Sequence, residues 1–292
     1  MIERIEESEL IINKDGSIFH LHLKPDEIAN DIILVGDPGR VETIAGYFDH
    51  IELSKQNREF VSCTGTFNGK RITVISTGIG TDNIDIVVNE LDALANVDFT
   101  TRTVKEKKRT LNLIRIGTSG ALQADIPVDS WLISAKAIGF DGMLNFYKGA
   151  IDVTDPLFET EFMNYLDWNP RLSTPYVVNA SRSLLSRIKT DAMEMGITIS
   201  APGFYGPQGR VIRLNLQDQH INQKIENFEL NGQKVTNYEM ECSAIYGLSA
   251  LLGHEALTVC AIIANRLKGQ YSKDYKPVIE KLIETVLVQL TK

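Results

Sequence analysis

The segment LNLIRIGTSG, residues 111–120, decides how the chain folds. Its first half is an apolar run that contains one charged residue, Arg115, and its second half consists of Gly, Thr and Ser. A short apolar run followed by small residues predicts a buried strand that ends in a turn. We therefore expect a strand over residues 111–116 and a loop over residues 117–120.

The same unit occurs twice upstream. The apolar runs 32–35 and 71–76 lead into GDPG and TGIG, and helical patterns follow both. Strands that alternate with helices predict an α/β fold with a parallel or mixed sheet, in which ligands bind at the carboxyl ends of the strands. The further elements expected are strands over 128–137 and 257–264, helices from residue 40 and over 83–94, 180–195 and 239–252, and an irregular excursion or lid over 149–175.

Composition excludes several classes of protein. The net charge of -8 over 292 residues argues against nucleic-acid binding. No apolar run approaches the roughly 20 residues that span a bilayer, and the N-terminus lacks the apolar core of a signal peptide. Three widely spaced cysteines, Cys63, Cys242 and Cys260, indicate neither a disulfide framework nor a zinc site. We expect a cytoplasmic protein without a membrane or nucleic-acid partner.

Arg115 is the first candidate for chemistry. A guanidinium in a buried run needs an anionic partner, because an unpaired buried charge is costly. A structural ion pair would meet this need, and so would a bound anion. Small residues at 117–120 and a second arginine, Arg40, after another Gly-containing strand end favour an anion. Because arginine matches phosphate oxygens bidentately, phosphate is the expected anion.

Two further segments have both a structural and a functional interpretation. In NYEMEC, residues 237–242, the acids can simply favour a helix N-terminus, or they can bind sugar hydroxyls beside Met240. In FYGPQGR, residues 204–210, the residues can form a surface turn, or Phe204 can stack on a planar ring whose edge bonds to Gln208 and Arg210. The basic stretch 100–110 is most simply a solvated loop. Walker, dinucleotide-binding, hydrolase-elbow and zincin motifs are absent from the sequence.

Taken together, seven segments resemble the nucleoside phosphorylase family, and within it the uridine phosphorylases. In chain order they are residues 19–21 (FHL), 36–40 (GDPGR), 58–60 (REF), 76–80 (STGIG), 115–118 (RIGT), the Gln208/Arg210 pair and 237–241 (NYEME). The resemblance implies a three-layer α/β/α sandwich with a mixed central sheet. It also implies one domain over residues 1–292, with an N-terminal extension (1–18) and a basic loop insertion (100–110), assembled as a dimer at least and usually as a hexamer.

The resemblance assigns roles to matching positions. It implies that phosphate is bound by Gly36, Arg40, Arg115 and Thr118 with Arg58 of a partner subunit, ribose by Met240 and Glu241 with His20 of a partner subunit, and the base by Phe204, Gln208, Arg210 and Ile263. The catalytic groups would be Arg115, Gln208 and Arg210. Phosphate would be a co-substrate, no organic cofactor is expected, and a monovalent cation could lie near Glu59 and Ile79.

The resemblance implies phosphorolysis of uridine or a related pyrimidine nucleoside. Purine-cleaving relatives commonly carry an acid after the late strand, where this chain has Asn265 and Arg266. A purine or broad-specificity phosphorylase, a nucleosidase that uses water, and a catalytically silent nucleoside-binding protein stay open as alternatives.

Overall fold

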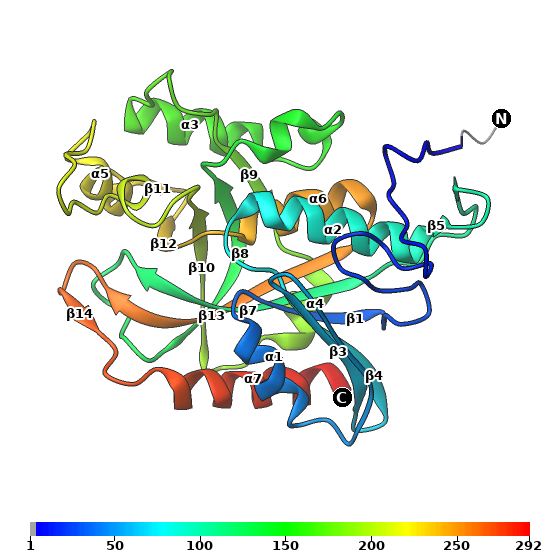
Figure 1. Cartoon of the computed structure of the whole chain (residues 1–292). Helices are drawn as coiled ribbons and strands as arrows, with labels where there is room; N and C mark the ends of the chain where they lie inside the picture. The colour runs from blue at the N-terminus through cyan, green and yellow to red at the C-terminus, as the bar shows by residue number, and fades with distance from the viewer. Residues whose placement is uncertain (1–3) are drawn as a thin grey trace.

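The computed structural model describes residues 4–292 (Figure 1). The strands are β1 (Asp31–Val35), β2 (His50–Asn57), β3 (Phe60–Phe67), β4 (Lys70–Ser76), β5 (Val97–Asp98), β6 (Thr103–Val104), β7 (Asn112–Ala121), β8 (Trp131–Gly139), β9 (Tyr176–Asn179), β10 (Met193–Ser200), β11 (Glu229–Leu230), β12 (Gln233–Glu239), β13 (Glu255–Asn265) and β14 (Gln270–Tyr271). The helices are α1 (Pro38–Ala45), α2 (Thr81–Asn96), α3 (Pro156–Leu166), α4 (Arg182–Ile188), α5 (Ile221–Asn227), α6 (Cys242–Leu252) and α7 (Lys276–Thr291), with 3-10 turns η1 (Met143–Phe146), η2 (Ala150–Asp152) and η3 (Gly206–Gln208).

One twelve-stranded mixed sheet runs through the molecule, in the order β11-β12-β10-β8-β13-β7-β1-β4-β3-β2, with β14 and β9 paired beside it. The central strands β1, β4, β7 and β13 run parallel, while β8 is antiparallel to β13. Parallel strands must be covered on both faces, which explains why most residues of these strands are buried. The expected mixed α/β sheet is therefore confirmed.

Half of the sheet closes on itself. Strand β12 pairs parallel with β10 and antiparallel with β7, so that β12, β10, β8, β13 and β7 form a ring. Tyr238 on β12 pairs with Gly120 on β7. This closure places the end of β12, with Glu239, next to the strand that carries Arg115, although 124 positions of sequence separate these two residues.

Helices cover the sheet on two sides. Figure 1 shows α2 and α6 together on one face and α1 and α7 on the other. The apolar residues of α2 recur at the spacing of one helical face, and Ile84, Val88 and Leu91 are fully buried in the main core. This confirms the helix predicted over residues 83–94. Within residues 4–292, no helix has the length and apolar character that crossing a membrane requires.

Four local predictions are wrong. Residues 117–120 are not a loop but continue β7, whose partner is β13. The helix predicted over 180–195 ends at Ile188, and its last residues enter β10, because burial in the sheet outweighs the helical pattern. Residues 149–175 are not simply irregular, since they contain α3.

The fourth wrong prediction is the start of the helix expected over residues 239–252. Glu239 ends β12, Glu241 is the N-cap, and α6 begins only at Cys242. The two acids of the motif therefore lie in a strand end and a turn rather than in a first helical turn. Both side chains face the interior, where a helix dipole alone would not hold them.

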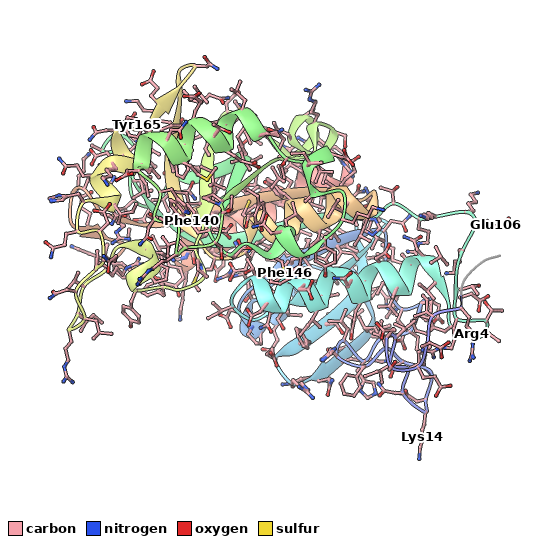
Figure 2. The ribbon with its side chains drawn as sticks, turned by 90° about the horizontal axis from the view of Figure 1, so that it is seen from above. Arg4, Lys14, Glu106, Phe140, Phe146 and Tyr165 are labelled. Carbon is pink, nitrogen blue, oxygen red and sulfur yellow. The ribbon has the colours of Figure 1, made fainter. Side chains whose placement is uncertain are left out.

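The basic segment 100–110 holds the N-terminal segment in place. Arg102 is buried, and its guanidinium donates to the backbone carbonyls of Ile5, Glu6 and Leu10. Figure 2 shows Arg4 and Glu106 at the same end of the molecule. The solvated-loop interpretation is therefore wrong at Arg102. Of the expected extension over residues 1–18, residues 1–3 lie outside the described part of the chain.

Candidate active site

Three charged side chains meet at the junction of β7, β12 and α6. Arg115 lies between Glu241, whose Oε2 accepts from Nη2, and Glu239, whose Oε2 lies 3.6 Å from Nη1. All three residues are nearly inaccessible, at 6%, 3% and 4% exposure. The structure thus joins the arginine predicted to bind phosphate to the glutamate predicted to bind ribose. The two interpretations of Arg115 are compatible, since it forms a buried ion pair at a candidate ligand site.

Burial and charge oppose each other in this cluster. Burial disfavours the charge of Arg115, but the two glutamates more than compensate and raise the pKa of its guanidinium. Burial also raises the pKa of Glu239 from its usual 4.5 to about 7, although the charge of Arg115 acts in the opposite direction. Two carboxylates stabilise the charge of the single cation between them, whereas the two carboxylates share the attraction of one cation and also repel each other.

Backbone geometry holds Arg115 in this position. A Cβ at residue 117 would collide with the guanidinium and would lie 3.1 Å from Cys260 Sγ, so only glycine lets the side chain fold back over its own strand. Glu241 Oε1 accepts a hydrogen bond of 2.7 Å from the Gly80 amide. The buried Nε of Arg115 has no acceptor among residues 4–292. An unsatisfied buried N–H is costly, and a ligand acceptor would remove that cost.

The other predicted phosphate residues lie around this cluster. Arg40, in α1, donates to the Ile116 carbonyl at 3.1 Å, and burial and then the charge of Arg115 lower its pKa. Gly36 follows β1 beside Gly78, whose carbonyl would be 3.4 Å from a Cβ at position 36. Thr118 lies in β7 and is partly exposed. Met240, half-buried between the two glutamates, is in the turn before α6.

The predicted base residues form a compact loop around η3. Arg210 Nη1 donates to Gln208 Oε1 and to the Phe204 carbonyl, each at 2.5 Å, and the guanidinium carbon lies 3.8 Å from the centre of the Phe204 ring. Arg210 thus occupies one face of Phe204, where a base was expected to stack. Gln208 is buried and Phe204 is half exposed. The loop brings all three together, with the ring of Tyr205 edge-on to that of Phe204 at 5.2 Å between ring centres.

Sequence reasoning missed Arg266, which follows β13. Its guanidinium donates to the backbone carbonyls of Gln208 and Gly209 and lies 5.9 Å from the ring centre of Tyr238. Burial lowers the pKa of Arg210, and the charge of Arg266 lowers it further. The available signal was a charged residue directly after a buried strand.

A β-bulge shapes the same region. The register between β13 and β7 shifts at Ile263, between Ile262 and Ala264, and Ile263 is half-buried. Bulges re-aim side chains and are frequent beside active sites. Tyr238, which contacts Arg266, precedes Glu239 in β12. Contacts therefore link Gln208 to Arg266 and Arg266 to Tyr238, the neighbour in sequence of Glu239 in the Arg115 cluster.

In the described part of the chain, the contacts of His20 and Arg58 do not include the Arg115 cluster or the base loop. His20 Nδ1 is 2.6 Å from Glu90 Oε1, its ring contacts those of Phe19 and Phe60, and the Arg58 guanidinium lies 5.8 Å from the Phe19 ring centre. Across residues 4–292, no hydrogen bond or ion pair links His20 or Arg58 to the Arg115 cluster or to the base loop. Arg58 is exposed in the β2–β3 turn at a φ of 54°.

Comparison with known proteins adds to this geometry. Residues 31–287 match the family model of the phosphorylase superfamily. This chain belongs to the phosphorylase superfamily.

Relatives of this chain include two uridine phosphorylases. That of Thermococcus kodakarensis is 29% identical over 94% of this chain and 86% of its own length, and that of Haemophilus influenzae is 29% identical over 93% and 96%. A solved nucleoside phosphorylase of Trypanosoma brucei, described as showing uridine phosphorylase activity, is 30% identical with a TM-score of 0.85 over 96% of this chain and 99% of its own. A DeoD-type purine nucleoside phosphorylase of Listeria welshimeri is 27% identical over 86% of this chain and 88% of its own length.

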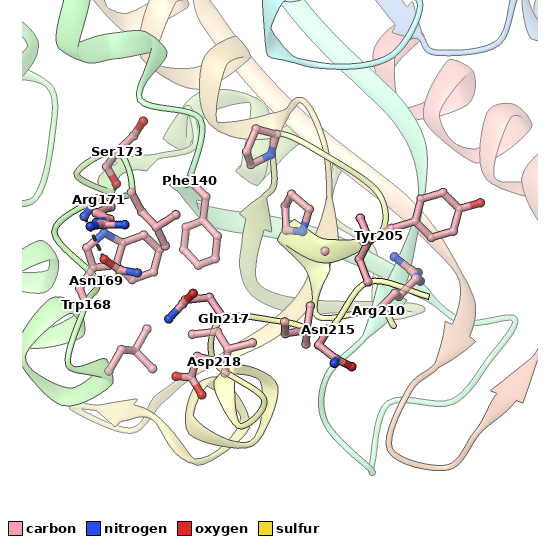
Figure 3. A pocket seen from close by; sticks show the side chains of 18 of the residues that line it. Phe140, Trp168, Asn169, Arg171, Ser173, Tyr205, Arg210, Asn215, Gln217 and Asp218 are labelled. Atoms are coloured by element: carbon pink, nitrogen blue, oxygen red, sulfur yellow. Dashed lines mark hydrogen bonds between the residues drawn. The ribbon is translucent and has the colours of Figure 1, made fainter. Parts of the chain in front are cut away.

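The protein also has a cavity of about 980 Å³ beside the base loop (Figure 3). Phe140, Trp168 and Tyr205 line it, and Arg210 is the one predicted site residue in its wall. Because it does not include Gln208, Arg115 or the glutamates, cavity size alone would have pointed away from the charged cluster. We take the charged cluster as the candidate reaction site, because its buried groups carry the chemistry.

Proposed function

We propose that this chain cleaves uridine, or a closely related pyrimidine nucleoside, with phosphate, and releases uracil and ribose 1-phosphate. The observation that carries the proposal is the contact between Arg115 and Glu241. It joins the predicted phosphate residue directly to the predicted ribose residue. A phosphate on the arginine side and a ribose on the glutamate side would therefore be neighbours, as attack at C1′ requires.

Each end of the site has a part in the reaction. Arg115, Arg40 and Thr118 position phosphate below C1′, where it meets the positive charge that develops as the glycosidic bond breaks. Arg210 and Gln208 hydrogen-bond the uracil, and their bonds strengthen as negative charge grows on the departing ring. Met240 packs on the sugar and Glu241 accepts its hydroxyls. Ile263 lies against the base. No organic cofactor takes part in this scheme.

The site is shared between subunits in this proposal. His20 and Arg58, which have no hydrogen bond or ion pair to the Arg115 cluster within residues 4–292, would reach the site of a partner in a homodimer, the unit of a hexamer. The proposal also includes a monovalent cation near Glu59 and Ile79. Glu59 is exposed and follows Arg58 in the sequence, and its Cγ would lie 3.3 Å from a Cβ on Gly78, one residue before Ile79. The protein is proposed to work in the cytoplasm.

A nucleoside panel, offered with and without phosphate, tests the activity. Release of uracil from uridine only when phosphate is present is the expected result, with ribose 1-phosphate as the second product. Release without phosphate would indicate a nucleosidase, and preferential release of purines would indicate the purine alternative. No release of any base, despite binding of uridine, would indicate a silent binding protein. Arg115→Met, purified in the same way, controls for contaminating enzymes.

Mixing two inactive variants tests the shared site. Arg58→Ala and Arg210→Ala each disable every site of their own homodimer. In a mixed dimer, one site would contain both substitutions and the other none, so random mixing should restore about a quarter of the sites. Failure to recover any activity after subunit exchange would contradict the donation of Arg58 across the interface.

A further inference from the structure

The Arg115 cluster has an imbalance of charge. One guanidinium faces two carboxylates, Glu239 and Glu241, and all three side chains are at most 7% exposed. When both carboxylates are ionised, the buried group carries a net negative charge. Arg40 offsets part of it from α1, because its charge acts on Arg115. The guanidinium that is proposed to bind phosphate is already neutralised by its own chain.

A phosphate dianion at this place would add negative charge beside two carboxylates. Like charges at short range in a poorly hydrated interior repel strongly. Arg115 attracts the anion fully only if one carboxylate loses its charge. Uptake of a proton at the cluster does this without movement of the backbone.

The hydrogen bonds select the carboxylate that takes the proton. Both oxygens of Glu241 are committed, one to the Gly80 amide and one to Arg115. Glu239 has no hydrogen bond to Arg115: its Oε2 accepts from the backbone amides of Glu241 and Cys242, and its Oε1 accepts from the Cys242 amide and lies 2.5 Å from the Ser200 hydroxyl, a group that can accept as well as donate. Oε1 can therefore carry a proton toward Ser200 while Oε2 still accepts from both amides. A proton on Glu239 therefore disturbs the Arg115–Glu241 pair least.

Few other groups near Glu239 can change charge. Its neighbours are Arg115 on β7, Glu241 and Cys242 at the start of α6, Ser200 on β10, and Cys260 on β13, whose pKa responds to the charge of Glu239. Burial raises the pKa of both thiols, so both stay neutral near pH 7. With its own pKa raised to about 7, Glu239 has its proton available near neutrality.

We infer that Glu239 is a positioning residue that takes up one proton when phosphate binds next to Arg115, and so frees the guanidinium for the anion. The inference rests on the proposed phosphate site. The proton comes from solvent and returns to it when the dianionic sugar phosphate leaves, so the overall reaction is unchanged. Affinity for a dianion should then fall with rising pH above neutrality, by at most about tenfold per pH unit for one coupled proton.

Calorimetry of anion binding tests this directly. The probe is sulfate, because it stays a dianion from about pH 6 to about pH 9, the range in which Glu239 would change its charge. Phosphate itself titrates in this range and would confuse the proton count. Titrations are run at about pH 7.5, where the coupling between sulfate binding and proton uptake should be large. Comparison of buffers with different ionisation enthalpies gives the number of protons taken up per sulfate bound. We expect uptake approaching one proton in the wild type and none in Glu239→Gln. Glu159→Gln, which alters another carboxylate of raised pKa in α3, should leave the uptake unchanged.

The outcomes separate the inference from the proposed function. Sulfate or phosphate binding without proton uptake, or with the same uptake in Glu239→Gln, overturns the role of Glu239 and leaves the phosphate site intact. Absence of binding by both anions overturns the phosphate site and the inference with it. If Glu239→Gln does not fold, absence of proton uptake by the wild type, or a sulfate affinity that does not change with pH, still overturns the inference.

Discussion

At the phosphate and ribose end of the candidate site, Arg115 projects from β7 and is buried between Glu239 and Glu241. At the base end, Arg210 lies half-buried on a loop, where it stacks on Phe204 and donates to the Phe204 carbonyl and to Gln208 Oε1. The first arginine is neutralised by Glu239 at the end of β12 and by Glu241 at the N-cap of α6, whereas the second has no ion pair with a carboxylate among residues 4–292. Fixed charges suit an anion of constant shape, and a loop can adjust to a planar ring.

The difference predicts that the two arginines fail differently. Arg115→Met leaves two carboxylates buried without their cation, so it should lower the free energy of unfolding by about 3–5 kcal/mol and kcat/KM by at least about a hundredfold. Urea unfolding and uracil release measure the two effects. Lys234→Met, which breaks an exposed pair with Glu229, should change stability little. Wild-type stability of Arg115→Met would mean that the cluster is not held together by this charge.

Arg210→Ala should affect chemistry and not folding. Removal of its donors from the departing base should cost about 2.7–4 kcal/mol of transition-state stabilisation, while the half-buried loop position leaves unfolding almost unchanged. Steady-state kinetics with uridine and urea unfolding measure this contrast. Arg213→Ala, an exposed arginine three residues on, is the matched control. Near-native activity of Arg210→Ala would contradict the assignment of the base loop.

The buried end should also show in the dependence of stability on pH. Glu239 has a higher pKa in the folded protein, about 7, than the usual 4.5, so the folded state holds its proton where the unfolded state has lost it. The protonated carboxyl therefore makes its full contribution to the free energy of unfolding below about pH 4.5, and this contribution is lost progressively as the pH rises to about 7. At 1.36 kcal/mol per pKa unit, the loss is as much as roughly 3 kcal/mol. Urea unfolding at several pH values should show a smaller loss in Glu239→Gln. An identical loss in both proteins would place the titration elsewhere.

Arg266→Met should give the smallest effect. The substitution keeps much of the volume but removes donors to the carbonyls of Gln208 and Gly209, which hold the base loop. We expect a cost of about 1–2 kcal/mol, seen mainly as a higher KM for uridine, while the affinity for phosphate is unchanged. Equal losses for both substrates would show that Arg266 supports the whole site and not only its base end.

The sequence correctly predicted those helices and strands that are determined by the pattern of their own residues. The largely apolar sequences of β1 and β13 predicted strands, and the one-sided apolar pattern of α2 predicted a helix, because burial on two faces or on one is visible in residue spacing. It failed at β10, where a helical pattern enters the sheet, and at residues 117–120. There the outcome depends on a partner strand that is distant in the sequence.

By itself the sequence determined which residue types are available for an anion, a sugar and a planar base. Only the tertiary structure decided their partners. Closure of β12 onto β7 places Glu239 and Glu241 against Arg115, and the end of β13 places Arg266 under the base loop. The physical reason is that a buried charge takes its properties from the charges and dipoles within a few ångströms, and these come from strands more than a hundred residues away.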